Sequence, residues 1–87
     1  MNYTVLWQPA AEEQLAALWT SAEDRNDVAA AADAIDARLR RNPLAEGESR
    51  GGVRRILFIP PLVALFVVDE PNRTVYVRAV GLARRPC

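Results

Sequence analysis

The segment Leu62–Val68 is apolar at every position, and it constrains the fold more than any other part of the chain. Successive side chains of a β-strand point to opposite faces of the sheet. Alternation therefore places four of these side chains on one face and Val63, Leu65 and Val67 on the other. A strand that is apolar on both faces belongs in the middle of a sheet, with material packed on each side.

Two further strand-like segments flank this central one. Gly51–Ile59 precedes it across Pro60-Pro61, and Arg73–Val80 follows it across a Glu-Pro-Asn turn. Short runs of β-branched and aromatic residues, separated by Pro and Asn, are typical of consecutive strands. Such short connections join antiparallel neighbours. The second half of the chain therefore predicts an antiparallel meander of three strands.

The first half predicts one strand and two helices. Asn2–Trp7 alternates and is rich in β-formers. Apolar residues then recur at helical spacing over Pro9–Ser21, with Pro9 suited to the first turn, and over Asp24–Arg41, where Asp24 is a capping residue. Asn42-Pro43 stops the second helix, because a residue before proline is pushed out of the helical region.

The expected fold is α+β, with the order β-α-α-β-β-β in a single domain over residues 1–87. A helical hairpin packs on one face of a small, largely antiparallel sheet, and Trp7 and Trp19 lie in the core. Two helices cover only one face of the central strand. We expect a partner chain, a second copy or a returning terminal segment on the other face.

The composition excludes several kinds of chemistry. The chain has no histidine and a single cysteine, Cys87, so His- or Cys-based nucleophilic schemes and zinc sites of the usual spacing are not available. Neither a dinucleotide-binding nor a P-loop motif is present, and no metal or cofactor is expected. No segment has the length of a membrane span and the first residues do not read as a signal peptide, so we expect a cytoplasmic protein without membrane contact.

Charge divides the chain in the same place as the secondary structure. Nine acidic and four basic residues lie in positions 1–48, whereas seven arginines and two acidic residues follow. Such asymmetry favours a polyanion or an acidic protein as partner. The alternative is that the arginines surround the strands and pair with carboxylates of the helices.

The order of these segments, together with the string GGVRRILFIPPLVALFVVDEPNRTVYVRAVGLARR, resembles the RelE/ParE superfamily of bacterial toxins, which includes plasmid-stabilisation proteins. The second helix ends with the pattern Leu39-x-x-Asn42-Pro43, which occurs at the same place in the order of elements in this family. The resemblance covers nearly the whole chain and implies the toxin of a type II toxin–antitoxin module, neutralised by an antitoxin that wraps its helices and sheet.

The chain departs from the family pattern where the messenger-cleaving members carry their polar groups. Val63 stands where an arginine is usual, Phe66 stands where a tyrosine is usual, and the ending ARRPC has neither Tyr nor His. After Val80-Gly81, the apolar Leu82 and Ala83 precede Arg84. The resemblance leaves three functions open: a toxin that binds DNA gyrase, a metal-independent endoribonuclease that cleaves messenger RNA on the ribosome, or a non-catalytic member that binds an antitoxin or forms a homodimer.

Two sets of candidate site residues follow. If the chain cleaves RNA, its phosphate contacts are expected from the arginines of the strands and tail, namely Arg54, Arg55, Arg78 and Arg84. If it binds a protein, the contacts are expected from the second face of the sheet and its surroundings, namely Val63, Leu65, Val67, Tyr76 and Arg85.

The last strand contributes to both sets. Strict alternation places Tyr76 and Arg78 on one of its faces, opposite Val75, Val77 and Ala79. A modest anion site would form there with an arginine of the preceding strands. The alternative is a half-buried tyrosine beside a solvated arginine.

Overall fold

The computed structural model of the chain describes residues 2–49, 51 and 53–82. Its elements are β1 (Thr4–Trp7), α1 (Pro9–Ser21), α2 (Arg25–Arg41), the 3₁₀ turn η1 (Pro43–Ala45), β2 (Glu48–Ser49), β3 (Arg54–Ile59), β4 (Leu62–Asp69) and β5 (Thr74–Leu82). The α+β class and the predicted order are confirmed, and the two-residue strand β2 and the turn η1 are additions to it. Within this part of the chain, neither helix is long and apolar enough to cross a membrane.

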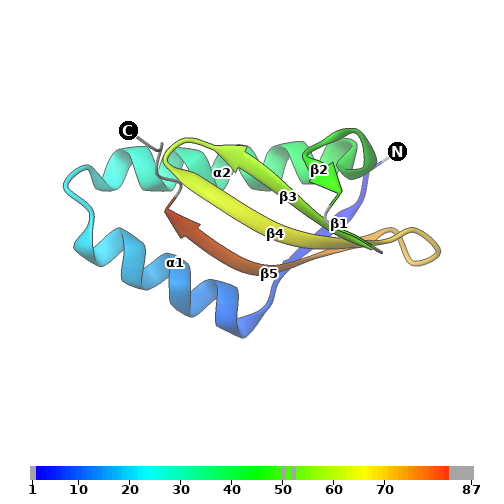
Figure 1. Ribbon diagram of the computed structural model, residues 1–87, viewed down its shortest axis with the longest axis horizontal. Helices are drawn as coiled ribbons and strands as arrows, with labels where there is room; N and C mark the ends of the chain where they lie inside the picture. Colours follow the sequence, from blue (N-terminus) through cyan, green and yellow to red (C-terminus); the bar gives the residue numbers. More distant parts are fainter. Residues whose placement is uncertain (1, 50, 52, 83–87) are drawn as a thin grey trace.

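The five strands form one sheet in the order β1-β5-β4-β3-β2 (Figure 1). The meander β3-β4-β5 is antiparallel, as predicted, and β4 is its central strand. β1 lies at the edge and pairs with β5 in parallel, so that Thr4 is opposite Thr74 and Trp7 is opposite Val77. The first strand is therefore placed by a strand that follows it by about 70 residues in the sequence.

Both helices begin where the sequence predicts. Pro9 occupies the first turn of α1, and the side chain of Asp24 accepts hydrogen bonds from the backbone N–H groups of Asn26 and Asp27 at the start of α2. These bonds satisfy two of the four donors that a helix start leaves free. α2 ends in three arginines, whose charge suits the negative end of a helix dipole.

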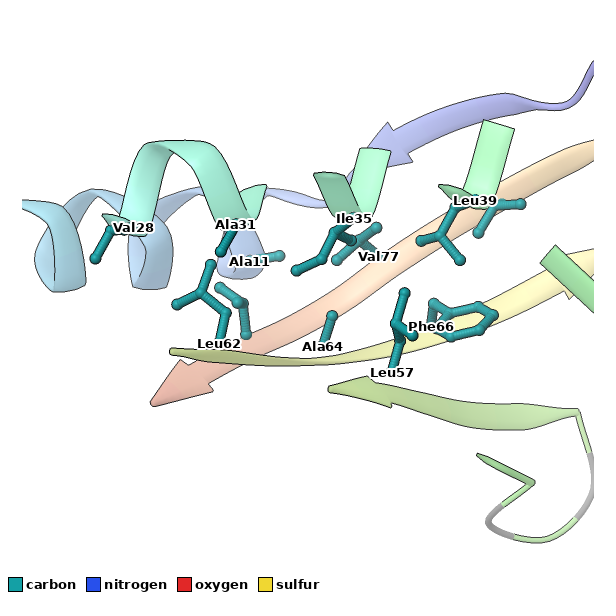
Figure 2. Packing of buried hydrophobic residues seen from close by; sticks show 12 residues of the cluster. Ala11, Val28, Ala31, Ile35, Leu39, Leu57, Leu62, Ala64, Phe66 and Val77 are labelled. Atoms are coloured by element: carbon teal, nitrogen blue, oxygen red, sulfur yellow. The ribbon is translucent and has the colours of Figure 1, made fainter. Parts of the chain in front are cut away.

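The hydrophobic core lies between the helices and one face of the sheet, which we call the inner face. α2 directs Val28, Ala31, Ile35 and Leu39 toward the sheet, as Figure 2 shows. Three strands of the sheet contribute the buried side chains that pack against them, namely Leu57, Leu62, Ala64, Phe66, Val75, Val77 and Val80. The helices thus cover one face of β4, as the sequence predicts.

The two tryptophans differ from each other, and the prediction that both lie in the core is wrong for Trp19. Trp7 is half-buried against the core, and its Nε1 donates to Asp36 Oδ1 on α2 at 3.4 Å. Trp19 is 44% exposed, and the guanidinium of Arg25 lies 4.7 Å from the centre of its ring. The reason is helical geometry: Leu18 faces the core, and its neighbour is turned about 100° around the helix.

Candidate functional site

The face of the sheet opposite the helices, which we call the outer face, has an apolar centre. Val63 and Leu65 of β4 lie between Phe58 and Ile56 of β3 on one side and the small residues of β5 on the other. These side chains are half-buried or exposed, and Phe58 is 48% exposed. The alternation predicted for the central strand is therefore confirmed, with one face under the helices and the other open in the described part of the chain.

Polar groups gather at one end of the outer face. Arg54, Val67 and Tyr76 occupy one row across β3, β4 and β5, and Leu6 of β1 continues the row beside Tyr76. Tyr76 and Arg78 line a hollow of about 610 Å³ there. Their predicted position on a common face is confirmed. Gln8, Asp69 and Glu70 also line this hollow, with apolar groups from Val53, Val67, Val68 and Pro71.

Arg55 does not join this cluster. It pairs across the sheet with Phe66, and its side chain lies on the inner face, where Nε donates to the carbonyl of Glu46 at 3.1 Å and Nη2 donates to that of Gly47 at 3.3 Å. Consecutive strand residues point to opposite faces, so Arg54 and Arg55 cannot serve one site on a face. The expected phosphate contact of Arg55 is replaced by a bond to the loop before β2.

A β-bulge in β5 changes the expected alternation. The pairing with β4 shifts between Leu65, opposite Ala79, and Phe66, opposite Val77, and Arg78 is the extra residue. Ala79 consequently lies with Leu65 on the outer face, and Val80 takes the buried position on the inner face. The prediction that Ala79 shares a face with Val75 and Val77 is wrong, because alternation fails at a bulge.

The sequence prediction also includes Arg84 and Arg85, which lie outside the described residues. Of the predicted phosphate contacts, the structure therefore brings Arg54 and Arg78 to the same end of the outer face. The residues that line the hollow beside them are of mixed charge, because Asp69 and Glu70 line it together with Arg78. Among the residues that the structure describes, no group of three His, Cys, Asp or Glu side chains is placed to hold a metal ion.

A second surface, which we call the helix groove, opens between α1, α2 and β1. It has a volume of about 700 Å³ and is mainly apolar, with Leu15, Trp19 and Val28 among its lining residues. The charged residues that line it are all acidic, namely Glu12, Asp33 and Asp36. This groove is not among the sites predicted from the sequence. Its signal is Trp19, which lies off the stripe that α1 turns toward the core.

No family model and no curated protein matches the sequence. Solved structures do match. A chain of the RelBE2 toxin–antitoxin complex from Mycobacterium tuberculosis is 21% identical, with a TM-score of 0.77 over 95% of this chain and 100% of that one. The isolated RelE toxin of E. coli is 15% identical, with a TM-score of 0.70 over 97% and 87% of the two chains.

A chain of the chromosomal ParDE toxin–antitoxin system of P. aeruginosa is similar as well. It is 15% identical, with a TM-score of 0.65 over 94% of this chain and 97% of that one. At these identities the likeness concerns the fold, and it spans nearly the whole of each chain. The chain, with its two helices and five-stranded sheet, thus shares its fold with these RelE and ParDE toxin–antitoxin structures.

Proposed function

We propose that this chain is the toxin of a type II toxin–antitoxin pair, and that it acts in the cytoplasm by binding a target protein through the outer face. The observation that carries the proposal is the apolar centre of that face, with Arg54, Tyr76 and Arg78 confined to one end. Contiguous exposed apolar side chains mark interaction surfaces. Aromatic residues and arginine are enriched in protein interfaces, where they supply much of the binding energy.

We propose DNA gyrase as the target, as for the gyrase-binding members of the superfamily that the sequence resembles. Binding of this kind needs no general base, and arginine cannot act as one because its guanidinium is always protonated in proteins. Protein binding also tolerates Val63 in place of the usual strand arginine, since an apolar side chain on the contact surface strengthens the contact. It tolerates Phe66 in place of the usual tyrosine as well. Of these two, Val63 lies on the outer face and Phe66 is buried in the core.

The second candidate is cleavage of messenger RNA on the ribosome. The observation in its favour is that Tyr76 and Arg78 line the same hollow, where a phenol and a guanidinium could contact one phosphate. The carboxylates of Asp69 and Glu70 oppose it, because they repel a polyanion. The orientation of Arg55 toward the inner face also removes one expected phosphate contact.

We further propose that the antitoxin inserts an amphipathic helix into the helix groove. The exposed part of Trp19 offers an anchor for an apolar side chain, and tryptophan is common among the residues that dominate binding energy. Asp36 is paired with Arg40, and the other acidic residues of the groove, Glu12 and Asp33, favour lysine or arginine at the borders of the inserted helix. This groove and the outer face are lined by different elements for the most part, so occupation of each is testable by itself.

Inducible expression in a bacterium tests the function. We expect growth arrest by the natural chain and its loss in Leu65→Asp, which places a charge in the apolar centre, whereas Arg41→Ala on the exposed end of α2 serves as the control. Both variants must fold by circular dichroism. Purified protein is then assayed for inhibition of gyrase supercoiling and for messenger cleavage on ribosomes.

The three functions give different results. Inhibition of supercoiling that Leu65→Asp abolishes supports gyrase binding. Messenger cleavage that Tyr76→Phe or Arg78→Ala abolishes contradicts it in favour of the nuclease. Unaffected growth with a folded chain contradicts both, and a non-toxic chain that binds an antitoxin or forms a homodimer is then the remaining function.

A further inference from the structure

The bulge in β5 leaves Arg78 without a residue directly opposite it on β4. Before it, β5 pairs with β4 in one register, with Val77 opposite Phe66, and after it the register is shifted by one residue, with Ala79 opposite Leu65. A shift of one residue turns every later side chain to the other face. Without the bulge, Val80 would leave the core and Arg78 would stand directly opposite Leu65, in the apolar centre of the outer face.

The bulge coincides with the point at which β5 loses a neighbouring strand. β1 ends at Trp7, opposite Val77, and the N–H of Gln8 donates to the carbonyl of Val77 at 2.9 Å. Beyond that residue, the side chain of Gln14 on α1 supplies the next hydrogen-bond partner for β5. Its Oε1 accepts a hydrogen bond from the N–H of Val80 at 2.9 Å, across 66 residues of sequence.

These two bonds hold the bulge on both of its sides. The backbone of Gln8 fixes the residue before Arg78, and the side chain of Gln14 fixes the second residue after it. Val80 is only 6% exposed, whereas Gln14 is exposed, so this N–H lies at the border between the core and the surface of α1. A backbone donor that is buried without a partner destabilises the arrangement that contains it.

We propose that Gln14 is a positioning residue, which selects the bulged register of β5 and thereby presents Arg78 at the edge of the hollow beside Tyr76. Gln14 does not line that hollow, and it acts through the Val80 N–H. The burial of Val80 favours the same register, so the glutamine and the core act together. The functional part of this inference rests on the proposed role of the outer face, and the structural part does not.

Three substitutions separate the acceptor from other properties of the side chain. Gln14→Ala removes the acceptor and, because alanine is the better helix former, does not weaken α1 by its helix propensity. Gln14→Met keeps a long side chain without a comparable acceptor. Gln14→Glu keeps an acceptor oxygen and serves as the rescue variant. Glu13→Ala, an exposed neighbour on α1, is the matched control.

Amide hydrogen exchange and backbone chemical shifts measure the structural effect. We expect the Val80 amide to exchange about tenfold faster or more in Gln14→Ala and Gln14→Met, with shifts of the Arg78 and Ala79 resonances. Gln14→Glu and Glu13→Ala should resemble the natural chain. Unchanged exchange and resonances in both acceptor-free variants overturn the proposal, as does a Gln14→Glu chain that behaves like Gln14→Ala.

Titration of gyrase supercoiling with the purified protein measures target binding, with Arg78→Ala as the reference, and growth arrest measures its consequence in the cell. We expect Gln14→Ala to weaken target binding in the same direction as Arg78→Ala, by about tenfold, and Gln14→Glu to restore it. If Arg78→Ala leaves growth arrest intact, the proposed role of Arg78 in the function is wrong, and the Val80 amide still decides whether Gln14 holds the bulge.

Discussion

The two faces of β4 provide a matched test of the fold. Leu62→Ala and Leu65→Ala remove the same atoms from the same strand, three residues apart. Leu62 is 0% exposed between the sheet and the helices, whereas Leu65 is half-buried on the outer face. The structure therefore predicts different losses of folding free energy for one chemical change.

The size of the difference follows from burial. Leucine-to-alanine changes in a closed core lower the free energy of unfolding by about 2–5 kcal/mol. The loss has two parts, the transfer free energy of the removed atoms and the cost of the cavity that they leave. We expect about 3 kcal/mol for Leu62→Ala, which corresponds to a fall in Tm of roughly 12–24 °C in a domain of this size. Leu65→Ala leaves no closed cavity, and we expect about 1 kcal/mol or less from the part of its surface that is buried.

Urea unfolding followed by tryptophan fluorescence measures both losses, as shifts of the midpoint at an unchanged m-value. The measurement is made on dilute protein, after size-exclusion chromatography has shown that it is monomeric. Equal losses at Leu62 and Leu65 would refute the reasoning, because they would mean that the outer face is closed as tightly as the inner one. In the presence of the target, the cost of Leu65→Ala should rise, since binding adds to the stability of the folded state.

Three further predictions concern single contacts. Asp24→Ala should lower the free energy of unfolding by about 1 kcal/mol, as measured in urea, because α2 loses its capping bonds. Gly47→Ala should lower the free energy of unfolding by about 1–3 kcal/mol, because the residue has a φ of +71° and a Cβ would collide with the carbonyl oxygen of Ile56. A Tm equal to that of the natural chain would contradict this expectation. Trp19→Ala should change the free energy of unfolding by about 1 kcal/mol or less, because the ring is 44% exposed and packs on an exposed arginine. The same change should weaken binding of the antitoxin, measured by calorimetry, by about tenfold or more. Antitoxin affinity that is unchanged by Trp19→Ala would place the antitoxin elsewhere.

Much of the fold follows from local patterns in the sequence. The helix starts at Pro9 and Asp24 and the meander of β3, β4 and β5 are confirmed because each rests on neighbouring residues: a proline, a capping carboxylate, or strands joined by short turns. The parallel position of β1 beside β5 depends on residues about 70 positions apart. Periodicity predicts a strand there and does not specify its neighbour.

The site was less predictable for related reasons. A single extra residue at Arg78 inverts the alternation beyond it, and nothing in the apolar pattern marks where the inversion occurs, since Ala79 and Val80 are both compatible with a core. Two adjacent arginines in β3 must point to opposite faces, but the register with Phe66 is needed to say which of them faces the helices. Trp19 was misplaced because an apolar ring next to a core residue fits either a core or a groove.

The pairing of β1 with β5 has a consequence for synthesis of the chain. The helices and their apolar stripe leave the ribosome well before Thr74–Leu82, the strand that both α1 and β1 require. Until that strand is complete, β1 has no hydrogen-bonding neighbour in the native sheet and the core has no inner-face residues from β5. Contacts of such long sequence separation form slowly. A nascent chain of this kind therefore completes its sheet only after β5 has been synthesised, and β1 and α1 stay accessible to proteases and chaperones until then.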